Sequence, residues 1–258
     1  MNNFPTPLLI SLYVIVFLYG IVIGSFLNVV ICRVPRKESL IKSRSHCEGC
    51  GYQLRWYDLI PLFSYIFLGG KCRKCKAIIS IQHPLIEGLN GVLYLMIFAK
   101  FGLTVDCLLY CLLASALLAM SVIDFRTYEI PPGFPIFIAV LGGIHLTLDY
   151  TNWLEYLIGA VAVSGFMFLI IWFWPDAMGG GDMKLMAACG LLLGWKLVVV
   201  AFIFGCALGS VIHVARMIIS KEDHVLALGP YLAAGVMLAV MWGNQFIGWY
   251  LNFIGLNV

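Results

Sequence analysis

The sequence has very little charge. Only 11% of its 258 residues are Asp, Glu, Lys or Arg, whereas 62% are hydrophobic. A soluble domain carries about 25% charged residues, so this composition excludes an ordinary soluble protein. No Lys or Arg precedes the first apolar run, residues 8–31, which is also longer than a signal-peptide core. We therefore predict a polytopic, all-α membrane protein that retains its first helix.

The apolar runs predict about eight transmembrane helices. They cover residues 8–31, 84–101, 106–123, 134–148, 153–174, 183–194, 197–220 and 229–253. The fourth and sixth runs are shorter than the roughly 20 residues that cross the hydrocarbon core. These two helices would be tilted less than the others, begin inside the bilayer or have other boundaries.

The basic residues predict the orientation of the chain in the membrane. With eight spans and an external amino terminus, all Lys and Arg except Lys100 and Lys196 lie on the cytoplasmic side, as positively charged loops do. The same arrangement puts Asp124 and Asp182 at the cytoplasmic ends of their helices. Because neither acid was used to choose the orientation, their shared face supports a common site.

The composition divides the chain into three predicted parts. Residues 1–32 form the first transmembrane helix, residues 33–83 form a polar cytoplasmic subdomain, and residues 84–258 form a multi-helix membrane core. In the first helix, Gly20-x-x-x-Gly24 is typical of close helix packing. Ser25 and Asn28 in the same helix either take part in this packing or face a substrate.

The polar subdomain contains two Cys-x-x-Cys pairs, which are Cys47 with Cys50 and Cys72 with Cys75. This spacing is typical of a tetrahedral four-cysteine zinc site. Structural disulfides are rare in a reducing cytoplasm. We therefore predict a structural zinc, because four protein ligands leave no open position for water.

A run of glycines precedes one of the two acids. The candidate substrate cleft beside Asp182 comprises Gly179, Gly180, Gly181 and Lys184. Glycine allows close backbone approach, so an extended peptide could lie here. The alternative is a flexible turn in which Asp182 caps the following helix.

Asp124 is the second acid, and it ends another apolar run. An ionisable residue at such a position is a functional hypothesis by default, although Asp124 could instead pair with nearby Arg126. Two acids that share a water can hydrolyse a peptide bond when one is ionised and the other is protonated. The two helices that carry Asp124 and Asp182 must then be neighbours.

Taken together, these motifs resemble the type IV prepilin leader peptidases, which are aspartic peptidases of the Gly-x-Gly-Asp type. The resemblance runs through Gly24-Ser25-Phe26-Leu27-Asn28, the two cysteine pairs, Pro61-Leu62-Phe63-Ser64, Pro84-Leu85-Ile86-Glu87, Asp124 with Ile130-Pro131, Gly179-Gly180-Gly181-Asp182, and Gly229-Pro230-Tyr231-Leu232. The chain departs from the family pattern at His83 and Pro132, and neither residue matches an expected catalytic group.

The resemblance implies an enzyme with two activities. Asp124 and Asp182 would be the catalytic aspartates that remove the leader from type IV prepilins or pseudopilins. The second activity would methylate the new amino terminus with S-adenosylmethionine, and Gly70 is the candidate for binding that methyl donor. The family also implies the bacterial cytoplasmic (inner) membrane as location. No nucleic-acid partner is expected.

Two other function classes explain part of the pattern. A transporter could use the two acids to bind a cation or relay protons, but the sequence has no evident inverted repeat. A scaffold could use the zinc subdomain to recruit a partner, which leaves Asp182 and its glycines without a role. Cleavage of a synthetic prepilin by the purified protein separates the peptidase from both alternatives.

Overall fold

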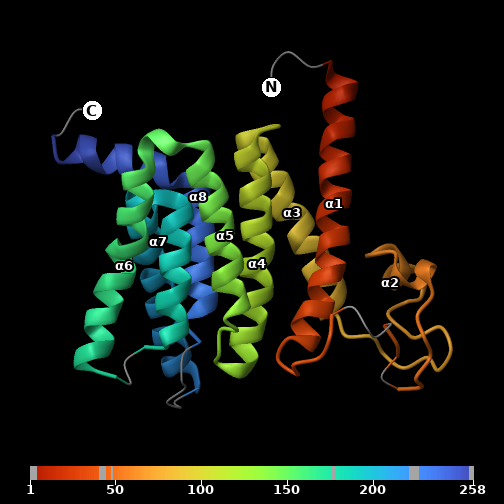
Figure 1. Cartoon of the computed structure of the whole chain (residues 1–258). Coiled ribbons are helices and arrows are strands. Elements are labelled where there is room, and N and C mark those ends of the chain that lie inside the picture. The colour runs from red at the N-terminus through yellow and green to blue at the C-terminus, as the bar shows by residue number, and fades with distance from the viewer. Residues whose placement is uncertain (1–4, 41–44, 48, 176–177, 221–226, 256–258) are drawn as a thin grey trace. The chain divides into compact units, whose positions relative to one another are not determined.

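The computed structural model describes residues 5–40, 45–47, 49–175, 178–220 and 227–255 (Figure 1). Its described part is helical, and the only β-structure in that part consists of two isolated bridges. The chain divides into two compact units, Met1–Ala119 and Met120–Val258. The boundary falls inside helix α4 (Val105–Thr127). The three-part division expected from composition stays a prediction.

The first unit is built on a close pair of helices, α1 (Thr6–Arg33) and α3 (Gln82–Phe101). A Cβ atom on Gly20 would lie 2.7 Å from the Cα of Gly91, and one on Gly24 would lie 2.7 Å from the Cα of Glu87. The two glycines therefore let the backbones touch, which confirms the predicted packing role of this motif.

Polar side chains strengthen this helix pair inside the apolar region. The Asn90 amide donates to the carbonyl of Gly20 at 2.7 Å, and Ser115 of α4 donates to Asn90 at 2.9 Å. The Ser25 hydroxyl bonds to Glu87, and the Asn28 amide donates to the carbonyl of His83 at 3.1 Å. Ser25 and Asn28 thus bind α3, as the packing interpretation expects.

The second unit contains the remaining long helices. They are α5 (Gly133–Leu148), α6 (Trp153–Phe173), α7 (Gly180–Ser220) and α8 (Gly229–Phe253), with the short 3-10 turn η2 (Tyr150–Asn152) between α5 and α6. Helix α7 packs against the other three. The core of this unit is therefore organised around α7.

Helix α7 is broken at Gly194, whose φ of 78° and ψ of 170° are not helical. Before the break, Gly190 packs against Gly159, and Gly194 itself lies beside Tyr156. Residue numbers rise along α7 as they fall along α6, so this first half runs antiparallel to α6.

The second half of α7 runs antiparallel to α8. A Cβ atom on Gly243 would lie 2.6 Å from Leu197, and one on Gly205 would lie 3.0 Å from Leu232. A straight helix of 41 residues would measure about 60 Å, roughly twice the hydrocarbon thickness. The break at Gly194 divides this length into two helical segments.

Six helices in the described part of the chain are long and apolar enough to cross a membrane. The count of eight spans is therefore not confirmed. The predicted sixth and seventh runs are joined in α7, because the helical pattern continues on both sides of Gly194. The predicted fourth run is α5, which has only 16 residues. The chain is a multi-pass membrane protein.

Candidate functional site

Two buried acids from distant parts of the sequence come together in the second unit. Asp124 lies in the last turn of α4 and is 4% exposed, and Asp182 lies in the first turn of α7 and is 8% exposed. The two carboxyl groups interact electrostatically. The helices that carry them therefore meet at these ends, as the prediction of a shared site requires.

The first residue of α8 also takes part in this site. The backbone N–H of Gly229 donates to Oδ2 of Asp124 at 3.0 Å. A Cβ atom at position 229 would lie 2.6 Å from the same oxygen. Only glycine allows the backbone to approach Asp124 this closely without displacement. Gly229 is therefore a positioning residue for Asp124.

Asp182 has a different environment. Its backbone N–H donates to the carbonyl of Gly179 at 3.1 Å. Its side-chain atom Oδ1 is buried and has no hydrogen-bond partner among the described residues. A buried polar oxygen without a partner is costly and marks a place where water or a ligand binds. Asp182 thus has one carboxylate oxygen that no described residue binds.

The glycine run has separate roles at each position. Helix α7 begins at Gly180, so Asp182 is inside the first turn and is not its N-cap residue. Gly181 packs closely on Ile130, whereas a side chain at Gly180 would meet nothing within 4 Å. Lys184 is exposed. The surface beside Asp182 is therefore open at Gly180 and Lys184, and their assignment to a substrate cleft stays a prediction.

The four predicted zinc ligands lie together in the first unit. The Sγ atoms of Cys47, Cys50, Cys72 and Cys75 are all within 4.8 Å of one another. Hydrogen bonds from the backbone N–H groups of Cys75 and Lys74 lower the pKa of the Cys72 thiol to about 6. Because thiolates are the metal-binding form of cysteine, this donor set fits a four-cysteine zinc site.

The two cysteine pairs form equivalent turns. The N–H of Cys47 donates to the carbonyl of Tyr52, and the N–H of Cys72 donates to the carbonyl of Ala77. The residue after each pair has a positive φ, which is 68° at Gly51 and 61° at Lys76. Each turn is also closed by a bridge, between His46 and Gln53 or between Lys71 and Ile78. The turns therefore present two thiols each in the same way.

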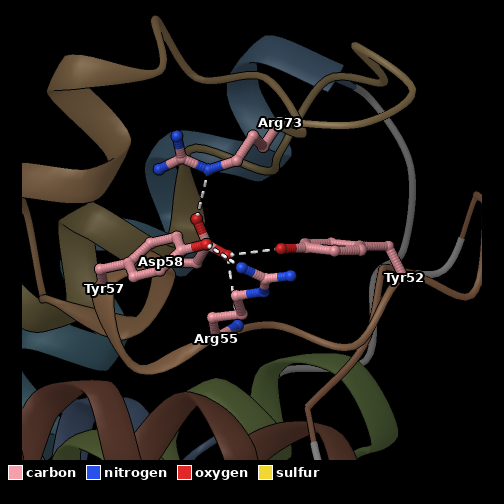
Figure 2. A network of polar contacts seen from close by, with 5 residues as sticks. All are labelled: Tyr52, Arg55, Tyr57, Asp58 and Arg73. Carbon is pink, nitrogen blue, oxygen red and sulfur yellow. Dashed lines mark hydrogen bonds and ion pairs between the residues drawn. The ribbon is translucent and has the colours of Figure 1, made fainter.

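Asp58 connects the two turns through a network of polar contacts (Figure 2). Its carboxylate accepts hydrogen bonds from Arg73 Nε at 2.8 Å and from the Tyr52 hydroxyl at 3.3 Å. Burial raises the pKa of Asp58, but the hydrogen bonds from Arg73 and from the backbone of Arg55 hold that pKa below its usual range. Asp58 thus stays ionised at neutral pH and holds Tyr52 and Arg73 in place.

Beside this network is a cavity of about 810 Å³ in the first unit. Its lining residues are Ser45, Tyr52, Gln53, Leu54, Arg55, Trp56 and Leu59. Gly70 is not among them. Gly70 has a φ of 67°, and its carbonyl accepts the N–H of Ile79 at 2.7 Å, so it closes a tight turn. This cavity could not be predicted from the sequence, because its lining residues are not spaced as a motif.

Two family models match the chain. The bacterial peptidase A24 N-terminal domain matches residues 18–101, and the type IV leader peptidase family matches residues 111–214. The first range contains the four cysteines, and the second contains Asp124 and Asp182. No solved structure matches the chain significantly.

Several curated relatives share most of the sequence. A prepilin leader peptidase/N-methyltransferase of Bacillus subtilis is 32% identical over 92% of this chain and 97% of its own length. Proteins of the same name from Pseudomonas aeruginosa and Burkholderia pseudomallei are 32% and 33% identical over 92% and 88% of this chain, and over 93% and 84% of their own lengths.

The apolar helices and these matches define the chain as a multi-pass membrane peptidase. More particularly, it belongs to the family of prepilin leader peptidase/N-methyltransferases, enzymes that combine peptidase and methyltransferase activity. The resemblance inferred from the motifs is thereby confirmed. Gly229 lies beyond the matched ranges, and its place in the Gly229-Pro230-Tyr231-Leu232 motif was the signal that could have revealed its role.

The contact between Gly229 and Asp124 gives a testable prediction. Replacing Gly229 with Ala should displace Asp124, the candidate catalytic acid, and lower kcat for peptide cleavage roughly 10- to 100-fold, the usual effect of a small displacement at an active site. Gly248→Ala in the same helix is the matched control, since a Cβ atom there meets nothing within 4 Å. Steady-state cleavage assays on both variants measure the effect. Parental turnover in Gly229→Ala would show that this contact does not position Asp124.

Proposed function

We propose that Asp124 and Asp182 form the catalytic pair of an intramembrane aspartic endopeptidase. The supporting observation is that two buried acids, 58 positions apart, interact at the meeting ends of α4 and α7. Burying acids in a membrane protein is costly, so such residues are usually functional. A structural pair would also be expected to satisfy both side chains, whereas Oδ1 of Asp182 has no partner among the described residues.

The proposed reaction is hydrolysis by general acid and base catalysis. One carboxyl group is ionised and removes a proton from the attacking water. The other is protonated and donates a hydrogen bond to the scissile carbonyl. The different surroundings of Asp124 and Asp182 suit two different roles, since Gly229 donates to only one of them. Both groups must contact the same water in the reactive complex.

The substrates are proposed to be type IV prepilins or pseudopilins. The names of the relatives state that those proteins process prepilins. Asp124 and Asp182 lie at helix ends, so the bond they cleave would be near a membrane surface. The distribution of Lys and Arg supports the cytoplasmic face of the membrane, and the family supports a bacterial inner membrane. A leader on that face would be removed there.

Loss of either acid should abolish peptidase activity. We expect Asp124→Asn and Asp182→Asn each to lower kcat by at least about 10³-fold, because removal of a catalytic group has effects of this order. Cleavage of a synthetic prepilin in proteoliposomes measures the loss. Asp106→Asn, at the opposite end of α4, is the matched control and should cleave normally. Near-normal turnover in either site variant would rule out the pair.

For the second activity, we propose that the cavity beside Asp58 binds S-adenosylmethionine. Its volume of about 810 Å³ is within the usual range for small-ligand sites. Trp56 and Tyr52 offer aromatic faces to a purine ring or a sulfonium cation, and Arg55 offers a guanidinium to a carboxylate. The bound molecule supplies the methyl group, and these residues hold and orient it.

This assignment predicts a loss of binding without loss of peptidase chemistry. Trp56→Ala and Arg55→Gln should each weaken binding of S-adenosylmethionine about tenfold, which corresponds to about 1.4 kcal/mol. Isothermal titration of the purified protein measures the Kd, and Asp124→Asn serves as the control that should bind normally. Unchanged Kd values in both cavity variants would place the methyl donor elsewhere.

The four cysteines are proposed to hold a structural zinc. In its described residues, the subdomain between α1 and α3 has only the short helices η1 (Trp56–Leu59) and α2 (Phe63–Phe67). Neither contributes a fully buried residue. A metal would therefore supply much of the folding energy of this segment. Its four thiolate ligands would leave no position for a catalytic water.

The purified protein should contain about one zinc per chain. Cys47→Ser should release the metal and expose the loop to proteases, whereas Cys206→Ser in α7 should retain it. Elemental analysis and limited proteolysis measure the two effects. If chelation stopped cleavage at once while the loop remained protected, the metal would be catalytic and this proposal wrong.

A further inference from the structure

The short helix α2 is fixed to the membrane part of the first unit. Leu62, the residue before α2, donates its N–H to Oε2 of Glu87 at 2.7 Å. Glu87 is the sixth residue of α3, so it lies about 7.5 Å along a helix that is long enough to span a membrane. Glu87 is itself held by contact with Gly24 of α1. The start of α2 is therefore level with the last turns of α1 and the first turns of α3.

Leu62 has an uncommon backbone conformation. Its φ is 58° and its ψ is −52°, a region that costs energy for a residue other than glycine. The buried carboxylate of Glu87 also accepts a bond from Ser25. Such a conformation persists only when its surroundings determine it. The turn at Leu62 therefore sets the direction in which α2 leaves the helix pair.

Helix α2 and its neighbours expose large apolar side chains. We use the term interfacial patch for Ile66, Phe67, Ile78 and Ile81, whose exposed fractions are 71%, 85%, 85% and 72%. In water, four such side chains near one another would be unfavourable. The patch therefore needs an apolar environment.

Backbone contacts bring the patch residues into one region. Gly70 donates to the carbonyl of Tyr65 in α2 at 2.9 Å and accepts from Ile79 at 2.7 Å. The adjacent pair Lys71 and Ile78 forms an antiparallel bridge. Ile78 is thus connected through Gly70 to the end of α2, which carries Ile66 and Phe67.

The same residues are continuous with the surface that faces lipid. Ile81 is the residue before α3, and Ile78 is three positions earlier, at most about 10 Å away along the chain. On the helices themselves, Phe26 and Leu85 are 50% and 59% exposed, as side chains on the lipid face of a spanning helix are. The patch therefore continues the lipid-facing surface into the subdomain.

Basic residues lie beside the patch. Lys71 and Lys76 are exposed, and Lys71 is the bridge partner of Ile78. Apolar side chains next to Lys or Arg are typical of segments that lie in the membrane interface, where the cations contact anionic headgroups. A protein partner would not require this continuity with the spans or this position at the end of α3.

From these observations we propose that the interfacial patch inserts into the lipid leaflet at the ends of α1 and α3. Helix α2 lies in the plane of the membrane interface and anchors the cysteine subdomain there. Lys71, the bridge partner of Ile78, contacts the phosphates of that leaflet. The proposal is independent of the peptidase and methyltransferase assignments, because it concerns only the attachment of the subdomain.

Photo-crosslinking in a defined bilayer tests the anchor. Phe67 is replaced by the photoreactive p-benzoylphenylalanine in the full chain, which is reconstituted in phosphatidylethanolamine and phosphatidylglycerol. Phe67 is 85% exposed, so the change should not disturb packing. After illumination, mass spectrometry of the labelled peptide should find a phospholipid adduct. The same replacement at Ile78 should give the same product.

Lys74 is the control position, because it is exposed and lies between Cys72 and Cys75 at the end of the second cysteine turn. The label there should give at least about fivefold less lipid adduct than at Phe67. Three results would overturn the proposal. They are equal lipid adducts at positions 67 and 74, a crosslink from position 67 to a second copy of the chain, and a crosslink to residues 120–258 of the same chain.

Discussion

The second unit depends on the cost of burying two carboxyl groups among apolar helices. A carboxyl group in a membrane helix must find a hydrogen-bond partner, accept a proton, or be used in chemistry. Asp124 finds a partner in the backbone N–H of Gly229. Asp182 leaves Oδ1 without one among the described residues. This asymmetry suits the proposed division of the two acids into a proton donor and a proton acceptor.

Glycines in this unit let backbone groups come close to one another and to Asp124. Helix α8 can bring an N–H group to Asp124 only because Gly229 has no side chain, and α7 can approach α6 because Gly190 faces Gly159. In an apolar solvent, close backbone contact replaces the hydrophobic effect as the force that holds helices together. Helix packing and the contact with Asp124 therefore use glycine for the same physical reason, which is access to the backbone.

Much of the candidate site could be predicted from the sequence. The two acids could be predicted because Asp124 and Asp182 interrupt or end apolar runs. The cysteines could be predicted because coordination chemistry fixes their spacing. The helical class and most helix positions followed from hydrophobic runs. These signals are local, so one sequence suffices to find them.

Other features depend on contacts between distant residues. Hydropathy predicts two separate spans, one on each side of Gly194. It does not show that α7 continues on both sides with only Gly194 in a non-helical conformation. The role of Gly229 depends on a contact with a residue 105 positions away. Asp58 lies in η1, and its partners Tyr52 and Arg73 come from the two cysteine turns, without a common spacing. Such features require the fold itself.

The paired cysteine turns show how local geometry can be shared while sequence differs. Gly51 and Lys76 occupy the same place after their cysteine pairs, and both have a positive φ. Glycine adopts this conformation without strain, whereas lysine adopts it only at a cost in free energy. The bridge between Lys71 and Ile78 and the bond from Cys72 to Ala77 hold the second turn despite that cost. A metal ion bound by all four cysteines would stabilise both turns. That stabilisation would offset the backbone strain at Lys76.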